Sequence, residues 1–281
     1  MDFRSRTWIT TSLLVLSMAG PACGQLIEVS RKAHGGIAFE RPLLDDFDPS
    51  FPSGAYNAFV VFPLQDGTTI ELMAPIAFVA SGGDEAFALG NPRIRFRSNA
   101  LGDVLAGDFA VNLPAATDDV AALSYGYRTV VAEDQERYAR DVTAITGGLD
   151  GTLELLDGRL AVRPRLEGSL WITASDEMEF FVRPSLGAIL RFERATLHAA
   201  LRVNHWATIG DVVDLGSLPL TLRQATFDES TIQDLLLEAE LDFGRIRPAV
   251  SLTVSLDDDV FGSSSPDFDK VLGLRVTAFR D

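Results

Sequence analysis

Cysteine, histidine and positive charge are all scarce in this chain of 281 residues. Its single cysteine, Cys23, cannot form an intrachain disulfide, and its three histidines do not stand in a metal-ligand pattern. The sequence contains no P-loop, dinucleotide fingerprint or GxSxG elbow. A formal net charge of −16 argues against nucleic acid, because a phosphate-binding surface must be positive. We therefore expect no metal, no cofactor and no nucleic-acid partner.

Long hydrophobic runs are also missing beyond the N-terminal segment. A helical membrane span needs about 18 or more consecutive apolar residues, so the sequence predicts none. A membrane barrel is compatible with this absence, because its strands alternate apolar and polar residues and have a low mean hydropathy.

The first residues have the pattern of an export signal. Arg4 and Arg6 precede the apolar stretch 8–20, and Ala22 and Gly24 provide the small residues of a cleavage site. We interpret 1–24 as a signal peptide and 25–281 as a single domain. A buried N-terminal helix is the alternative interpretation.

Cys23 leaves a second possibility for processing. Cleavage before this cysteine would make it a lipid attachment site, although Gly20 occupies the position where the lipoprotein pattern has leucine. Cleavage after Gly24 would leave a mature chain without cysteine, as suits an exported protein that needs no disulfide.

Period-two alternation dominates the mature chain. Between Arg245 and Leu256 every second residue is apolar, while the intervening positions are small or charged. Strands of soluble sheets usually have about 5 to 6 residues, whereas a tilted strand needs about 9 to 11 to cross a bilayer. Similar runs occur at 69–78, 92–97, 160–172, 178–190 and 235–243.

The connectors between these runs alternate in length. Short connectors such as 64–68, 156–159 and 243–245 fall at one end. Longer, acidic loops such as 43–55, 80–90 and 257–267 fall at the other, where 175–177 is an exception because it is short. We count about eleven strands and expect a twelfth from GIAFE (36–40) or IEVSR (27–31), because bacterial outer-membrane barrels have even strand numbers. The longest connector, 114–145, has helical spacing and is expected to form a short helix over the mouth or inside the lumen.

The predicted fold class is therefore all-β: a transmembrane antiparallel up-and-down barrel of about twelve strands, with short periplasmic turns and longer extracellular loops. A soluble sandwich or lipocalin-like barrel is the alternative. The expected location is the outer membrane of a Gram-negative bacterium. The expected partners are outer-membrane lipid and lipopolysaccharide, the barrel-assembly machinery and a small-molecule solute. For the acidic loops, solvated surface charge is the favoured interpretation, and divalent cations that bridge lipopolysaccharide are the alternative.

Arginine and carboxylate residues recur on the polar face of the runs. Buried charges persist when they are paired, so we expect an arginine–carboxylate ladder inside the lumen, favouring anionic or aromatic solutes. The predicted lumen-lining residues are Arg93, Arg95, Arg97, Arg163, Arg165, Glu167, Glu179, Arg183, Arg202, Glu238, Glu240, Arg245 and Arg247.

The histidines offer one alternative function. His198 and His205 are seven residues apart, so on one strand they face opposite sides and cannot share a metal. His205 falls on the face assigned to lipid, near the outer end of its run. A lipid hydrolase with a histidine in that position is therefore a candidate, although no serine is placed beside it.

The stretch GNPRIRFRSNALGDVLAGDFAVNLPAATDD (90–119) resembles the phenol-degradation MetA-pathway family of outer-membrane proteins. The matching motifs are GNP and LPA, while Arg95 and Arg97 replace the glycine and tyrosine usual in the first strand. The final strand VLGLRVTAF resembles the C-terminal signal read by the barrel-assembly machinery, although Arg280 and Asp281 follow it. The resemblance implies uptake of small, often hydrophobic compounds.

Together these patterns predict a non-enzymatic channel or uptake protein for small solutes, with hydrophobic or aromatic compounds among the expected ones. A membrane-embedded lipid hydrolase and a closed structural barrel are the alternative functions.

Overall fold

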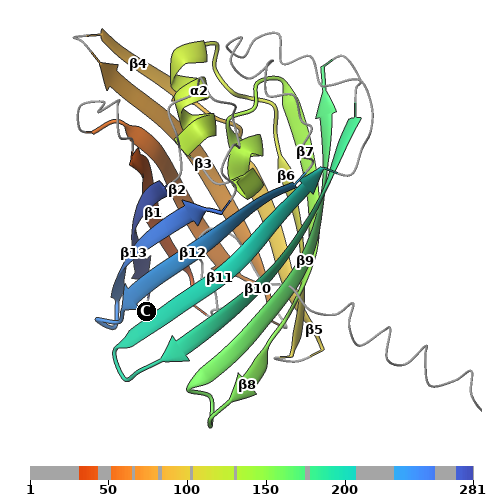
Figure 1. Ribbon diagram of the computed structural model, residues 1–281, viewed down its shortest axis with the longest axis vertical. Coiled ribbons are helices and arrows are strands. Elements are labelled where there is room, and N and C mark those ends of the chain that lie inside the picture. The colour runs from red at the N-terminus through yellow and green to blue at the C-terminus, as the bar shows by residue number, and fades with distance from the viewer. Residues whose placement is uncertain are drawn as a thin grey trace, which may run out of the picture.

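A computed structural model describes residues 32–43, 52–64, 67–81, 84–101, 104–129, 132–174, 178–206, 231–256 and 270–280. The described residues form one antiparallel sheet that closes on itself (Figure 1). The strands are β1 (His34–Leu43), β2 (Gly54–Pro63), β3 (Thr68–Ser81), β4 (Asp84–Leu89), β5 (Arg93–Leu101), β6 (Leu105–Asn112), β7 (Val142–Gly151), β8 (Leu153–Leu155), β9 (Leu160–Thr173), β10 (Met178–Arg191), β11 (Ala195–Trp206), β12 (Thr231–Leu241), β13 (Ile246–Ser255) and β14 (Lys270–Phe279).

Twelve of these strands make the closed ring, as predicted. β4 pairs only with the end of β3, and β8 pairs only with β9, so both are additions to the ring. The ring closes where β1 pairs with β14, from His34 opposite Phe279 to Leu43 opposite Lys270. The first strand contains GIAFE, one of the two alternatives, and IEVSR lies outside the described residues.

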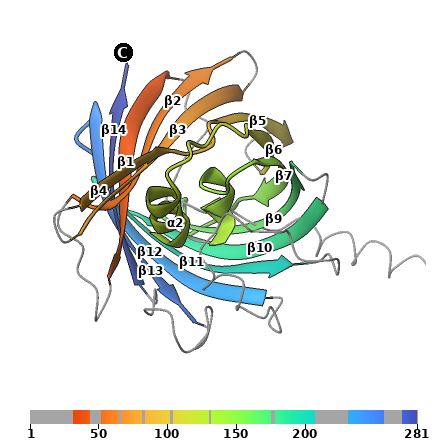
Figure 2. The same ribbon diagram turned by 90° about the horizontal axis from the view of Figure 1, so that it is seen from above.

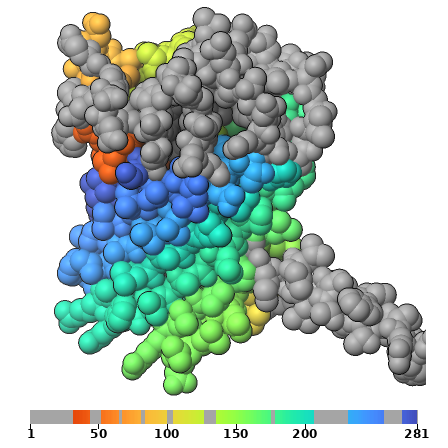
Figure 3. Space-filling model, viewed as in Figure 1, coloured from red at the N-terminus to blue at the C-terminus, as the bar shows by residue number. Residues whose placement is uncertain are grey.

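The two faces of the barrel follow the predicted alternation. On β11, Leu197 and Leu201 face outward and are each 43% exposed, whereas Arg202 faces inward and is 1% exposed. In the space-filling view, the side chains of β9 to β13 pack side by side into a continuous outer surface (Figure 3). A closed ring pairs its backbone groups strand to strand, which is what a sheet in hydrocarbon requires.

The ends of the barrel also differ as predicted. The turns that join β8–β9, β10–β11 and β12–β13 lie at one end, and α2 and β4 lie at the other (Figure 1). The hairpin of β3 and β4 was not predicted, because 80–90 was interpreted as a loop. There, β3 continues to Ser81 and the chain folds back along it.

The longest connector contains helix α2 (Val120–Thr129) and the 3-10 helix η1 (Ala132–Arg137). It is shorter than predicted, because β7 begins at Val142 and takes up the last residues of 114–145. Viewed from above, both helices lie inside the ring of strands (Figure 2). We call residues 113–129 and 132–141 the infolded segment. Neither of the described helices is long and apolar enough to cross a membrane.

Candidate functional site

The predicted lumen-lining side chains gather on the inner face, with two differences. Arg245 is exposed in the turn between β12 and β13, so it does not belong to the inner face. The Arg247 side chain is 31% exposed; it pairs with Asp242 at 2.8 Å and lies over the Phe279 ring at 4.7 Å. The buried members are Arg93, Arg95, Arg97, Arg163, Arg165, Glu167, Glu179, Arg183, Arg202, Glu238 and Glu240.

Six buried charges form a continuous chain across the wall from β5 to β10 and on to the infolded segment. Arg95 donates to Asp108 through Nε at 2.9 Å and Nη2 at 2.7 Å. Arg165 donates to the same carboxylate at 3.0 Å and also pairs with Glu167. We call this series, which Arg183 and Glu136 complete, the arginine–carboxylate chain.

Arg183 connects the wall to the infolded segment. Its guanidinium donates to Glu167 at 3.1 Å on the neighbouring strand and to Glu136 of η1 at 3.1 and 3.4 Å. Its Nε also donates to Asn204 at 3.0 Å. The side chains of Arg183 and Glu136 are each 1% exposed. A buried charge of this kind needs its partner, so the pair fixes η1 against β10.

Other charges are shared unequally along the wall. Arg97 donates to both oxygens of Asp150 at 2.6 and 2.8 Å, and Arg163 approaches the same carboxylate at 3.3 Å. On the opposite wall Arg275 is 3.0 Å from both Glu238 and Glu240, and Arg247 lies 3.9 Å from Glu240. Arg202 pairs with Asp234 on the adjacent strand. A cavity of about 30 Å³ beside Glu238 has room for one or two waters.

Asn91 holds the infolded segment at both of its ends. Its Nδ2 donates to the carbonyl oxygens of Glu136 at 2.9 Å and Ala139 at 2.6 Å, and its Oδ1 accepts from the N–H groups of Ala115 and Ala116 at 3.0 Å. These contacts join the GNP motif to the LPA motif. A buried asparagine that satisfies four backbone groups fixes the path of the segment.

Gly90 of the same motif permits a close backbone approach. A Cβ at this position would overlap the carbonyl oxygen of Arg137, which accepts from the Asn91 N–H at 2.6 Å. Any larger residue would push η1 away from the wall. The glycine is therefore required by packing against the infolded segment.

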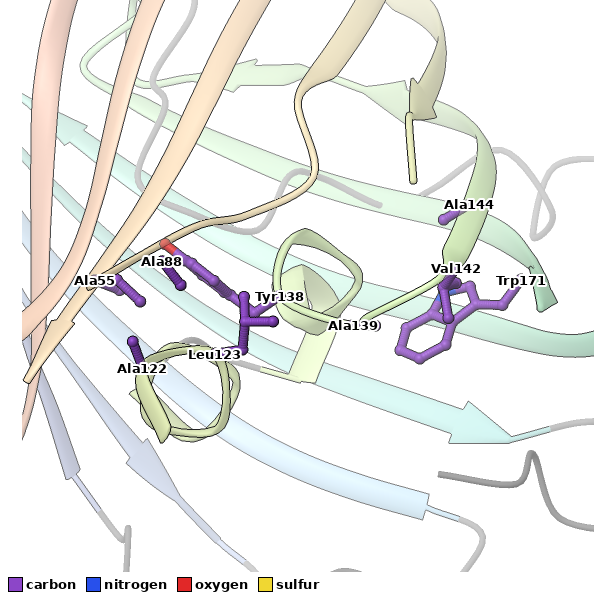
Figure 4. Close-up of a cluster of buried hydrophobic side chains, with 10 residues drawn as sticks. Ala55, Ala88, Ala122, Leu123, Tyr138, Ala139, Val142, Ala144 and Trp171 are labelled. Atoms are coloured by element: carbon purple, nitrogen blue, oxygen red, sulfur yellow. The ribbon is translucent and has the colours of Figure 1, made fainter. Parts of the chain in front are cut away.

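Apolar contacts complete the docking of the segment. Leu123 of α2 packs against Tyr138, and Trp171 of β9 lies beside Val142 (Figure 4). The Tyr138 hydroxyl donates to the carbonyl oxygen of Ile76 at 3.2 Å. The infolded segment thus belongs to a packed core inside the ring, which settles the open question of its position in favour of the lumen.

One part of the inner face is apolar. The residues buried together there are Phe59 and Val61 of β2 and Met73 of β3. Phe59 lies directly opposite Met73 in the pairing of the two strands. We call these three residues the apolar stripe. Sequence reasoning assigned the inner face to polar residues and did not identify it, although Phe59 and Val61 share the alternation of their strand.

The histidines lie as their spacing predicts. His198 is buried on the inner face of β11, and His205 is on the outer face of the same strand. The His205 Nδ1 lies 2.8 Å from the hydroxyl of Thr231, so its hydroxyl neighbour is a threonine. In the described parts of the chain, no three histidine, cysteine or acidic residues form a metal-binding group.

Several residues of the site were not predicted. Asp108 and Asp150 stand on the inner face of β6 and β7, and the same alternation that identified the arginines could have found them. Glu136 and Asn91 lie outside regular strands, where period-two reasoning gives no signal.

No family model and no curated protein matches the chain. Among solved structures, an outer membrane channel from Pseudomonas putida F1 is similar with a TM-score of 0.57 and 12% identity, over 94% of this chain and 98% of that one. The KdgM porin is similar with a TM-score of 0.51 and 7% identity, over 88% of this chain and 99% of that one. These similarities show that the chain has the fold of an outer-membrane β-barrel.

Proposed function

We propose that this protein is an outer-membrane channel through which small solutes pass a constriction formed by the infolded segment. The proposal rests on one combination of features. The outer face of the barrel is apolar, its inner face carries charged side chains, and the helix-containing infolded segment narrows the lumen. Apolar outer positions suit acyl chains, and inner charges can replace part of the hydration of a solute. Twelve strands enclose a narrow interior, much of which side chains fill, so large solutes are excluded.

Its surroundings follow from the same proposal. The signal peptide would direct export, the final strand would be read by the barrel-assembly machinery, and the outer wall would contact lipid and lipopolysaccharide. Membership of the MetA-pathway family is supported by the contacts that join GNP to LPA through Asn91. Apolar or aromatic solutes are favoured by the apolar stripe, which gives them an apolar surface on the inner face.

A closed structural barrel is the second candidate. It is favoured by the deep burial of the inner charges, since Arg183, Arg202 and Glu179 are at most 2% exposed. Ion pairs of this kind would rigidify a filled lumen as well as they would line a narrow one.

Conductance in planar lipid bilayers distinguishes the two candidates. We expect the wild-type protein to give small, discrete current steps, and the Arg183→Met variant to give larger ones because the infolded segment loses its charged attachment. Arg191→Met is the matched control, since this arginine is on the same strand but pairs with Glu154 at the exposed short-turn end. Wild-type protein that inserts without conducting would overturn the channel and favour the closed barrel.

A further inference from the structure

The apolar stripe is bordered by two polar side chains whose hydrogen-bonding capacity is unused. Along β2 and β3 the inner positions are Asn57 opposite Pro75, then Phe59 opposite Met73, then Val61 opposite Glu71. Asn57 is 1% exposed and Glu71 is 4% exposed. Both side-chain atoms of Asn57 and both carboxylate oxygens of Glu71 are without a hydrogen-bond partner within the described part of the chain.

Glu71 differs in this respect from the carboxylates of the arginine–carboxylate chain. Its neighbour in register on β5 is Arg95, but the Arg95 guanidinium directs both of its close hydrogen bonds to Asp108. A further titratable neighbour is His34 of β1, whose Nδ1 lies 3.1 Å from the Lys32 carbonyl oxygen. The negative charge of Glu71 thus has electrostatic neighbours and no donor.

Two of the three inner arginines of β5 direct their close hydrogen bonds to other carboxylates. Arg95 donates to Asp108, and Arg97 donates to Asp150. Arg93, the third, lies opposite Met73. A buried carboxylate without donors is unfavourable, because it has lost the hydrogen bonds of its hydration shell and has not replaced them. A ligand that relieves this cost must supply hydrogen-bond donors, and a positive charge relieves it further.

The apolar stripe defines the rest of such a ligand. The Phe59 ring and the Met73 side chain suit an apolar or aromatic body, and an aromatic face also attracts a cation. Asn57, at the other end of the stripe, can donate and accept. Apolar surface with a few converging polar groups is the usual composition of a small-molecule site.

We propose that Glu71, Asn57 and the apolar stripe form a subsite for a small organic ammonium ion with an apolar body, such as an arylalkylamine. The ammonium group donates to the Glu71 carboxylate, and the body lies on Phe59, Val61 and Met73. This inference rests on the proposed channel function for the route by which the ligand arrives, and it deepens that function by naming a substrate class.

Three ligands that differ in one group test the subsite: benzylamine, benzyl alcohol and benzoate. Binding to the purified, detergent-folded protein is measured by calorimetry, with heat-modifiable gel mobility as the check that each variant is folded. We expect benzylamine to bind about tenfold or more tightly than benzyl alcohol, and benzoate to bind least. Glu71→Gln should abolish the preference for the amine.

Two matched variants separate the subsite from general effects. Glu238→Gln removes an inner carboxylate that pairs with Arg275, and Arg275 still has Glu240 as its partner. The order of the three ligand affinities should therefore be unchanged. Phe59→Leu should weaken benzylamine and benzyl alcohol together. If the amine is not preferred, or if Glu71→Gln preserves the preference, the subsite is refuted. Glu71-dependent amine binding by a barrel that does not conduct would refute the channel and leave the subsite standing.

Discussion

Replacing Arg183 by methionine should cost more stability than any change at the exposed ion pairs. The substitution keeps an unbranched side chain of similar length but removes every donor. Glu167 retains Arg165, whereas Glu136, 1% exposed, loses its charged partner at 3.1 Å. Breaking a buried ion pair in this way typically costs about 3–5 kcal/mol, since the remaining charge is left uncompensated.

Neutralising Glu136 gives the complementary half of the prediction. Glu136→Gln alone should cost about 1.5–3 kcal/mol, the usual contribution of a hydrogen bond to a charged group. In the double variant the uncompensated charge is absent, so the two losses should not add. We expect the coupling between these positions to be about 1–3 kcal/mol.

Equilibrium unfolding in denaturant, followed by tryptophan emission, measures these losses. Trp171 is a suitable reporter because it packs in the cluster with Val142 and lies 4.7 Å from the Phe181 ring. Arg191→Met is the control, with an expected loss of about 0–1 kcal/mol for an exposed pair. If Arg183→Met costs no more than this control and the infolded segment gains no new protease cleavage, the segment is not held by Arg183.

The outer face and the docking of the infolded segment give two further predictions. Leu252 lies on the outer face, where its neighbours in register are Leu237 and Leu272. Leu252→Arg should lower the free energy of unfolding in lipid vesicles by about 2–4 kcal/mol, whereas Leu252→Phe should be close to neutral. Equal losses for the two variants would contradict the assignment of faces. Gly90→Ala should destabilise the barrel because its Cβ would overlap a backbone carbonyl, while Gly147→Ala, with open space around it, should change the free energy of unfolding little; the same denaturant series compares them.

The fold was predictable because its main determinant is local. Alternation along each run decides which residues face lipid, and a barrel needs only this pattern, an adequate strand length and an even count. The hairpin of β3 and β4 was not predicted, because alternation identifies only strands that have one face toward lipid. β4 extends the sheet beyond the ring, where a strand does not need an apolar face.

The pairing of charges was not predictable, because it depends on register between distant strands. Arg165 and Asp108 are 57 residues apart in sequence, and Arg97 and Asp150 are 53 apart. The position of the infolded segment was not predictable for the same reason, because it also depends on contacts between distant parts of the chain. The helical spacing of 119–141 predicted α2, but its place in the lumen depends on Asn91, which lies in another connector.

The paired geometry changes what the arginines imply about solutes. Counting arginines predicts a positive lumen that favours anions, but an arginine whose guanidinium is bound to a carboxylate presents little net charge to a passing solute. Selectivity should then depend on the places where pairing is uneven. Arg97 and Arg163 share Asp150, which leaves a local positive excess, and Glu71 beside the apolar stripe leaves a local negative one. A solute therefore experiences unbalanced positions along the wall, and these positions, more than the number of arginines, should determine which solutes are retained.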